Sequence, residues 1–95
     1  MDQIYYFEAE GDDSLIRTAR KELYRHVEPL EEVDARLPSP PFFRIHRSYI
    51  DNLDRVLELR LLGERDHEVK LDPPVNEVLP VGRDRYRALA LLLSL

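Results

Sequence analysis

The first part of the chain alternates apolar and polar residues, which is the pattern of β-strands that bury one face. An aromatic run at 4–7 begins a first strand, whose inner face continues at Ala9. Residues 11–13 (Gly-Asp-Asp) form a strong turn signal, after which the alternation resumes over 15–19. These segments predict an antiparallel hairpin, followed by a short third strand at 22–27.

A change of period then predicts a short helix at 29–37. Leu30, Val33 and Leu37 recur at helical spacing, and Pro29 suits a first helical turn. Prolines at 38, 40 and 41 end this helix.

The second half of the chain predicts further strands and a closing helix. Alternation and turn residues place strands at 42–46, 55–62, 67–71 and 75–81, with a loop or turn at 47–54. From Asp84 onward the apolar residues take helical spacing, with Asp84 as the expected N-cap. The chain therefore reads as one mainly β domain over 1–95, with a mid-chain and a C-terminal helix.

Composition narrows the class of protein. A length of 95 residues suits one domain, and the absence of cysteine excludes disulfides, thiol redox chemistry and thiolate zinc sites. The apolar run 88–95 is far shorter than the ~20 residues that cross a bilayer. No secretory pattern opens the chain. We expect a cytoplasmic protein without a membrane segment.

Catalysis and metal binding find little support. His26, His46 and His67 lie in three separate segments without clustered carboxylates, so no metal site is expected. Ser48, His46 and Asp51 could be assembled into a triad, but such matches arise by chance in most chains. There is no nucleophile elbow and no Gly-rich phosphate loop. The pattern therefore predicts a protein that is not an enzyme and needs no cofactor.

Polar residues gather where the predicted strands end. His46, Arg47 and Ser48 follow one strand with Asn52 shortly after, and Arg83 precedes the last helix. Arg and Asn are the side chains best suited to reading guanine and adenine edges in a major groove, which indicates DNA recognition. Purely structural alternatives remain open. The ring of His46 can pack on the sheet and hydrogen-bond a loop backbone, and Asn52 can close an Asx-turn.

The charge balance argues against tight DNA binding. The net charge is −5, whereas nucleic-acid binders are usually basic. Nearly all the cations are arginines, however, and a few placed bidentate contacts can operate within an acidic total. The acidic total favours an alternative function, a protein-interaction module that has lost DNA binding.

Four segments together resemble the LytTR family, the DNA-binding output domains of bacterial response regulators. They are IYYFEAEGDDSLIRTA, LEEVDARLP, FFRIHRSYIDNLDRVLEL and LPVGRDRYRALALLL, which span most of the chain. The resemblance implies an elongated fold of mainly antiparallel strands, with loops at one edge entering successive major grooves. It also implies double-stranded DNA as partner, with two protomers on paired direct repeats.

The resemblance also implies site residues. Asn52 and Arg83 match positions that contact bases, and the loop 11–14 matches one that approaches DNA. The residues expected at the DNA are therefore Asn52, Arg83, Arg47, His46, Ser48, Arg85, Asp13 and Ser14. Neither Asn52 nor Arg83 is expected in the core.

Departures from the family pattern concern charge. Asp51 stands where an apolar residue is usual, Gly82 replaces a usual serine, and Asp12 and Asp13 add negative charge to the first loop. We expect the Asp51 carboxylate at the groove rim, where it would oppose DNA. The competing view is that it holds its own loop, bonded within its turn or paired with a nearby arginine.

No receiver domain with its phosphoacceptor pattern is present in the sequence. The chain is therefore expected to be an excised output domain, with a receiver or sensor domain as possible neighbour, or a small standalone regulator.

Overall fold

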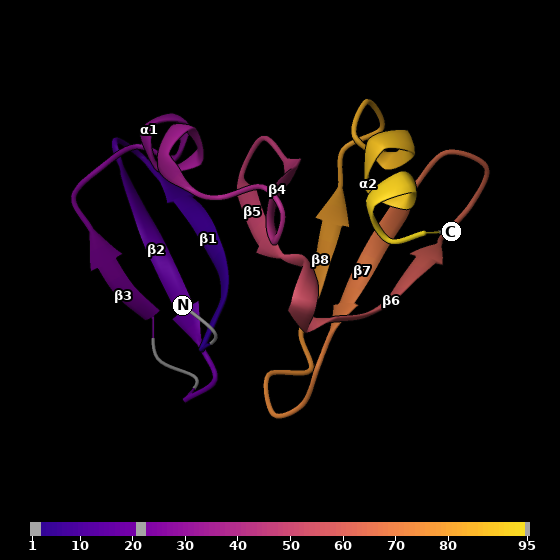
Figure 1. Cartoon of the computed structure of the whole chain (residues 1–95), viewed down its shortest axis with the longest axis horizontal. Helices are drawn as coiled ribbons and strands as arrows, with labels where there is room; N and C mark the ends of the chain where they lie inside the picture. The colour runs from indigo at the N-terminus through magenta and orange to yellow at the C-terminus, as the bar shows by residue number, and fades with distance from the viewer. Residues whose placement is uncertain (1–2, 21–22, 95) are drawn as a thin grey trace.

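The computed structural model describes residues 3–20 and 23–94, and these form two antiparallel sheets and two short helices (Figure 1). One sheet has the order β3-β2-β1-β5-β4 and the other the order β6-β7-β8. The elements are β1 (Ile4–Glu10), β2 (Asp13–Thr18), β3 (Leu23–His26), α1 (Leu30–Arg36), β4 (Phe42–His46), β5 (Tyr49–Asn52), a 3-10 turn η1 (Leu53–Arg55), β6 (Val56–Leu61), β7 (His67–Leu71), β8 (Val78–Val81) and α2 (Tyr86–Leu92). The prediction of a mainly β fold with a mid-chain and a C-terminal helix is confirmed.

The predicted N-terminal hairpin is confirmed. β1 pairs with β2 in a register that places Glu10 opposite Asp13 across a tight turn. Gly11 occupies the left-handed region at φ 58°, which a glycine adopts without steric cost. The third strand is confirmed as β3; residue 22, where the sequence placed its start, lies outside the described residues.

The prediction of a loop over 47–54 is wrong at residues 49–52. Residues 49–52 form β5, a strand that pairs with β1 on one side and β4 on the other. Asp51 and Asn52 looked like turn residues, but pairing on both sides buries this strand. Strand pairing between segments more than forty residues apart in sequence has no local signal.

The predicted strand at 75–81 is shorter than expected. Only β8, residues 78–81, pairs with β7. Asn76 has a positive φ of 54°, which asparagine tolerates in turns, so the chain bends before it can pair.

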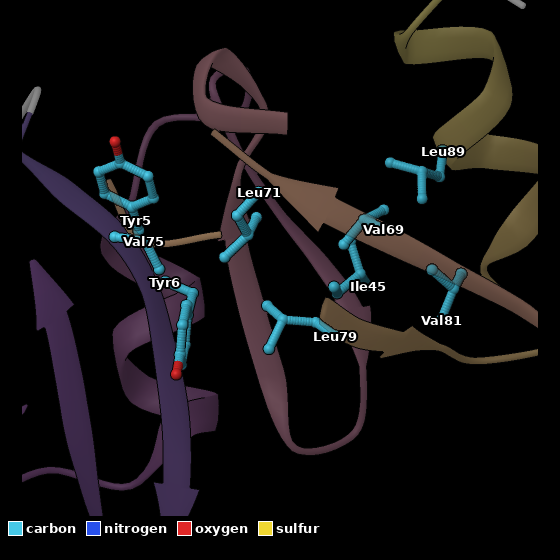
Figure 2. Packing of buried hydrophobic residues seen from close by; sticks show 9 residues of the cluster. All are labelled: Tyr5, Tyr6, Ile45, Val69, Leu71, Val75, Leu79, Val81 and Leu89. Carbon is cyan, nitrogen blue, oxygen red and sulfur yellow. The ribbon is translucent and has the colours of Figure 1, made fainter. Parts of the chain in front are cut away.

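Two apolar clusters hold the elements together. The larger lies between the sheets and α2, and Figure 2 shows its residues: Tyr5, Tyr6, Ile45, Val69, Leu71, Val75, Leu79, Val81 and Leu89. The smaller packs α1 against the first sheet through Phe7, Leu30, Val33, Phe42 and Ile50. Burial of Leu30 and Val33 confirms the amphipathic reading of the mid-chain helix.

A partly buried polar joint also links the two sheets. The Glu77 carboxylate, just before β8, accepts hydrogen bonds from the Tyr6 hydroxyl at 2.6 Å and from Arg17 Nε at 2.8 Å. Burial, and then the bond to Glu77, raises the pKa of Tyr6, so the phenol stays a donor. Arg17 is itself buried, so this carboxylate is what compensates its charge.

Asp51 lies inside the protein, not at a groove rim. Its exposed fraction is 0%, and it stands opposite Tyr6 on β1 and Phe43 on β4. Neither carboxylate oxygen has a hydrogen-bond partner among the described side chains and backbone groups. Burial raises its pKa well above the usual value for aspartate, because a charge is costly to hold away from water. The expectation of a rim charge is therefore wrong, and so is pairing with a nearby arginine; of the interactions expected within the turn, only the neighbouring Asn52 backbone amide favours the charged form, and burial outweighs it.

We predict that Asp51→Val stabilises the fold at alkaline pH. Because the folded pKa is raised, the folded state keeps a proton that the unfolded chain has already lost, so stability falls as pH rises from about 4 through the raised pKa. Valine removes both the unpaired polar atoms and this titration. The expected gain in the free energy of unfolding is about 1–3 kcal/mol at pH 8 and smaller at pH 5.

Urea unfolding at the two pH values measures this gain. Asp54→Asn is the matched control, because Asp54 is exposed on η1 and its neutralisation should change stability little. A variant no more stable than the wild type at pH 8, or a larger gain at pH 5, would contradict the assignment.

Candidate nucleic-acid interface

Three turns share one edge of the molecule, at the top of Figure 1: residues 11–12, 47–48 and 82–85, here called the loop edge. Backbone hydrogen bonds fix two of them to neighbouring elements. The Ala9 amide donates to the Ser48 carbonyl at 2.9 Å, which ties the second turn to β1. The Gly82 amide donates to the Ile45 carbonyl at 2.7 Å, which ties the third turn to β4. The loop edge thus draws on both sheets.

The turn between β4 and β5 presents Arg47 to solvent. The Ser48 amide donates to His46 Nδ1 at 3.0 Å, and the His46 ring lies tilted beside Tyr49 with centroids 5.8 Å apart. Arg44 donates from Nε to the His46 carbonyl at 3.2 Å, and from its terminal nitrogen to the Arg47 carbonyl. The turn is therefore bonded on both sides of an exposed arginine.

His46 is a neutral member of this edge. Burial, and then the charges of Arg47 and Arg44, lower its pKa below the usual 6.5. Since Nδ1 accepts a hydrogen bond, the ring proton sits on Nε2, which can donate. The packed-ring reading of this histidine is confirmed, while a phosphate contact from Nε2 stays a prediction.

Arg83, on the turn between β8 and α2, is exposed but paired. Its Nε donates to Asp66 Oδ1 at 3.1 Å, with the two side chains 65% and 62% exposed. Asp66 comes from the turn between β6 and β7. Arg83 therefore projects from its turn into solvent while an exposed ion pair holds its guanidinium.

The prediction that Asp84 caps the last helix is also wrong. α2 begins at Tyr86 after Arg85, and no side chain of the described chain caps it. The Arg85 amide donates to the Gly82 carbonyl at 2.9 Å, so the chain completes a turn before the helix starts. Asp84 and Arg85 both lie exposed in that turn, with Arg85 Nε 3.9 Å from Asp84 Oδ2.

The first turn offers less than the sequence suggested. Asp13 is already in β2, and its Oδ2 forms an ion pair with a terminal nitrogen of Arg25 at 2.7 Å. Ser14 is fully buried, and its hydroxyl has no partner within 3–20 and 23–94. Gly11 and Asp12 are the exposed residues of this turn. The structure therefore buries Ser14 and leaves Asp13 partly exposed, in an ion pair with Arg25.

Asn52 lies at the other end of β5, away from the loop edge. Its side chain donates to the carbonyl of Ile4, the first residue of β1, at 2.9 Å, and accepts from the Asp54 amide at 3.0 Å. With 3% exposure it is a core residue, which corrects the expectation that it lies outside the core. The Asx-turn reading is confirmed; contact with a base is not tested.

The loop edge has mixed charge and a hollow beside it. Exposed arginines at 47, 83 and 85 alternate with exposed aspartates at 12, 66 and 84. A cavity of about 480 Å³ is lined by His46, Asp66, His67, Gly82 and Arg83, among others. Within the described chain, no three His, Cys, Asp or Glu side chains are placed to hold a metal ion.

Sequence reasoning missed Arg44 and Asp66. Arg44 was read only as a strand residue, although it stands two positions before the turn that it bonds. Asp66 was read only as part of a turn, and its partner Arg83 lies 17 residues further on. The arginine of the F-x-R-I-H string could have been singled out; the aspartate carried no local signal.

Comparison with known proteins gives one consistent result. The CO-responsive transcriptional regulator RcoM of Rhodospirillum rubrum is 32% identical over 92 residues, which cover 97% of this chain and 38% of that protein. The transcriptional regulatory protein YpdB of Escherichia coli K12 is 30% identical over 95 residues, covering 100% and 38%. The chain thus spans well under half the length of these relatives.

A solved LytTr DNA-binding domain from Bacillus cereus has the same fold. It superposes with a TM-score of 0.86 at 21% sequence identity, covering 99% of this chain and 84% of that one. Within the described residues, no helix is both long and apolar enough to cross a membrane. The family model of the LytTr DNA-binding domain matches residues 1–94, and the chain therefore belongs to the LytTR family of DNA-binding domains, a non-enzymatic family of transcription regulators.

Proposed function

We propose that this domain binds double-stranded DNA through the loop edge and acts in bacterial transcription regulation, with Arg47 and Arg83 as its principal contacts. The carrying observation is that two exposed arginines, one between two strands of the first sheet and one after the last strand of the second, sit on turns fixed by backbone hydrogen bonds. Rigidly held arginines lose little freedom on binding and can bond guanine or phosphate bidentately. The regulators RcoM and YpdB, similar over nearly the whole chain, support the same role.

The shape supports reading in the major groove. The longest dimension is 36 Å, comparable to the ~34 Å helical repeat of duplex DNA. The loop edge runs along this dimension in Figure 1, so its two ends can face successive major grooves. We further propose that two protomers bind paired direct repeats. The domain would act in the cytoplasm, with a receiver or sensor domain in a longer chain.

Within this proposal the expected site residues divide by position. Arg47, Arg83 and Arg85 contact DNA directly, and the Nε2 of His46 and the Ser48 hydroxyl serve phosphates. Asn52 acts as scaffold, because both polar atoms of its side chain are used inside the protein. Contact from the first loop comes from residues 11–12, since Asp13 is paired and Ser14 buried.

We predict that Arg47→Ala and Arg83→Ala each weaken specific binding by about 1–3 kcal/mol without lowering thermal stability. Both side chains are exposed, so the fold does not depend on them. Asn52→Ala should instead lower the free energy of unfolding by about 1–3 kcal/mol, because two hydrogen bonds of a buried amide are lost. Fluorescence anisotropy and thermal melts separate the two effects.

The affinity of the wild-type domain for duplex DNA should be measured over a salt series in the same experiment. A few arginine contacts release few counterions, so log affinity should fall less steeply with log salt than for a protein with 6–10 phosphate contacts. No binding at low salt to any duplex from a randomised pool would overturn the proposed function. Unchanged affinity and specificity in Arg83→Ala would remove that residue from the interface.

A protein-interaction module is the second candidate. The net charge of −5 and the pairing of Arg83 with Asp66 favour it, since both reduce attraction for phosphates. Absence of duplex binding, together with an intact fold, would select this candidate.

We predict that Asp66→Asn strengthens DNA binding at low salt. The carboxylate occupies Arg83 in the free protein and adds a negative charge to the loop edge. An exposed ion pair is worth roughly 1 kcal/mol at most, so its loss should raise affinity about two- to fivefold. The gain should shrink as salt rises, because the effect is a screened charge interaction.

Asp54→Asn is the matched control, since it removes one exposed carboxylate from η1, at the end of β5 remote from the loop edge. Its effect on affinity should be clearly smaller. If Asp66→Asn weakened binding, the carboxylate would be holding Arg83 in its DNA-reading orientation rather than competing with DNA.

A further inference from the structure

Arg44 forms hydrogen bonds to the protein backbone that a purely solvent-exposed arginine would not form. Its side chain is 14% exposed, and its guanidinium reaches the carbonyl groups of His46 and Arg47 in the turn that follows its own strand. Its third contact, from a terminal nitrogen to Glu31 on α1, is long at 3.4 Å. The cation therefore acts chiefly on the backbone of the turn.

These bonds meet a need of the turn. Carbonyl groups in a tight turn that are not paired with backbone must find another donor. A planar guanidinium offers several donors in a fixed fork and can reach two carbonyl groups at once, which a lysine ammonium on a flexible stem does poorly. Two bonds of Ser48 hold the other side of the turn. Its amide donates to His46 Nδ1, and its carbonyl accepts from the Ala9 amide of β1.

We propose that Arg44 is a positioning residue, which fixes the β4–β5 turn so that Arg47 meets DNA in one orientation. This inference rests on the proposed function and deepens it. Arg44 directs its Nε and one terminal nitrogen at the backbone of the turn, so it acts chiefly through Arg47. Preorganised contact residues bind more tightly because less freedom is lost on binding.

The test combines Arg44→Lys with Arg47→Ala in a double-mutant cycle, using anisotropy on a duplex selected by the wild type. Arg44→Lys keeps the charge but loses the fork, so affinity should fall about three- to tenfold with the salt slope unchanged. In the Arg47→Ala background, the same substitution should cost little more, since the residue that it positions is gone.

Arg36→Lys is the matched control, an exposed arginine on α1 whose partner is Glu28 and which should tolerate the change. Glu31→Gln removes the carboxylate on the far side of Arg44, and it should leave affinity near the wild-type value because that contact is long and Glu31 is 73% exposed. Together these variants separate the bonds to the turn from the ion pair with α1.

A measurement on the free protein completes the test. Hydrogen exchange at the Ser48 amide, which is bonded to His46, should be faster in Arg44→Lys, while exchange in β7 of the other sheet stays unchanged. Wild-type affinity in Arg44→Lys, an equal loss in both backgrounds, or unchanged exchange at Ser48 would each overturn the inference. A wild-type protein that binds no duplex overturns the proposed function instead, and the exchange rate then decides alone whether Arg44 shapes the turn.

Discussion

The relative placement of the two sheets depends on the Glu77 carboxylate, which bonds Tyr6 and Arg17 across the interface. The apolar cluster supplies most of the contact area there, but apolar packing is non-directional, whereas these bonds fix an orientation. Arg17 is buried, so losing this partner would leave an uncompensated charge. Arg47 belongs to one sheet and Arg83 follows the other. The Glu77 joint, the Gly82–Ile45 backbone bond and the apolar cluster together keep both arginines on one loop edge.

Much of the fold could be predicted from local sequence patterns. The hairpin around Gly11 and the helix with Leu30 and Val33 follow from alternation, turn chemistry and spacing, and the structure contains both. β5 was missed because one of its two partners, β1, lies more than forty residues away in sequence, and the polar residues of the strand hid its short hairpin with β4. Asp51 and Asn52 resemble turn residues in sequence but lie in that buried strand.

The site was predictable only in part, for a geometric reason. Arg47 and Asn52 sit in one continuous motif, yet a short strand separates them, and they face opposite ends of the molecule. A motif shows which residues occur together but not which of them face solvent. Arg44 and Asp66 act through contacts with a turn and with an exposed arginine, and neither contact alters the hydrophobic pattern from which the strands were read. The negative charge of the edge was expected from Asp12, Asp13 and Asp51. Of these only Asp12 is an exposed residue of the edge; Asp84 and the neighbouring Asp66 supply the other carboxylates, and three exposed arginines balance them.

The most direct test of the account is a titration of the ¹⁵N-labelled domain with a duplex that it binds, followed by amide chemical shifts. The account predicts that the largest changes fall on residues 11–12, 47–48 and 82–85, the three turns of the loop edge. Amides of η1 and of the turn at 73–76 should change little, because they lie at the other end of the sheets. Changes concentrated around Asn52 and η1, with the loop edge unaffected, would contradict it.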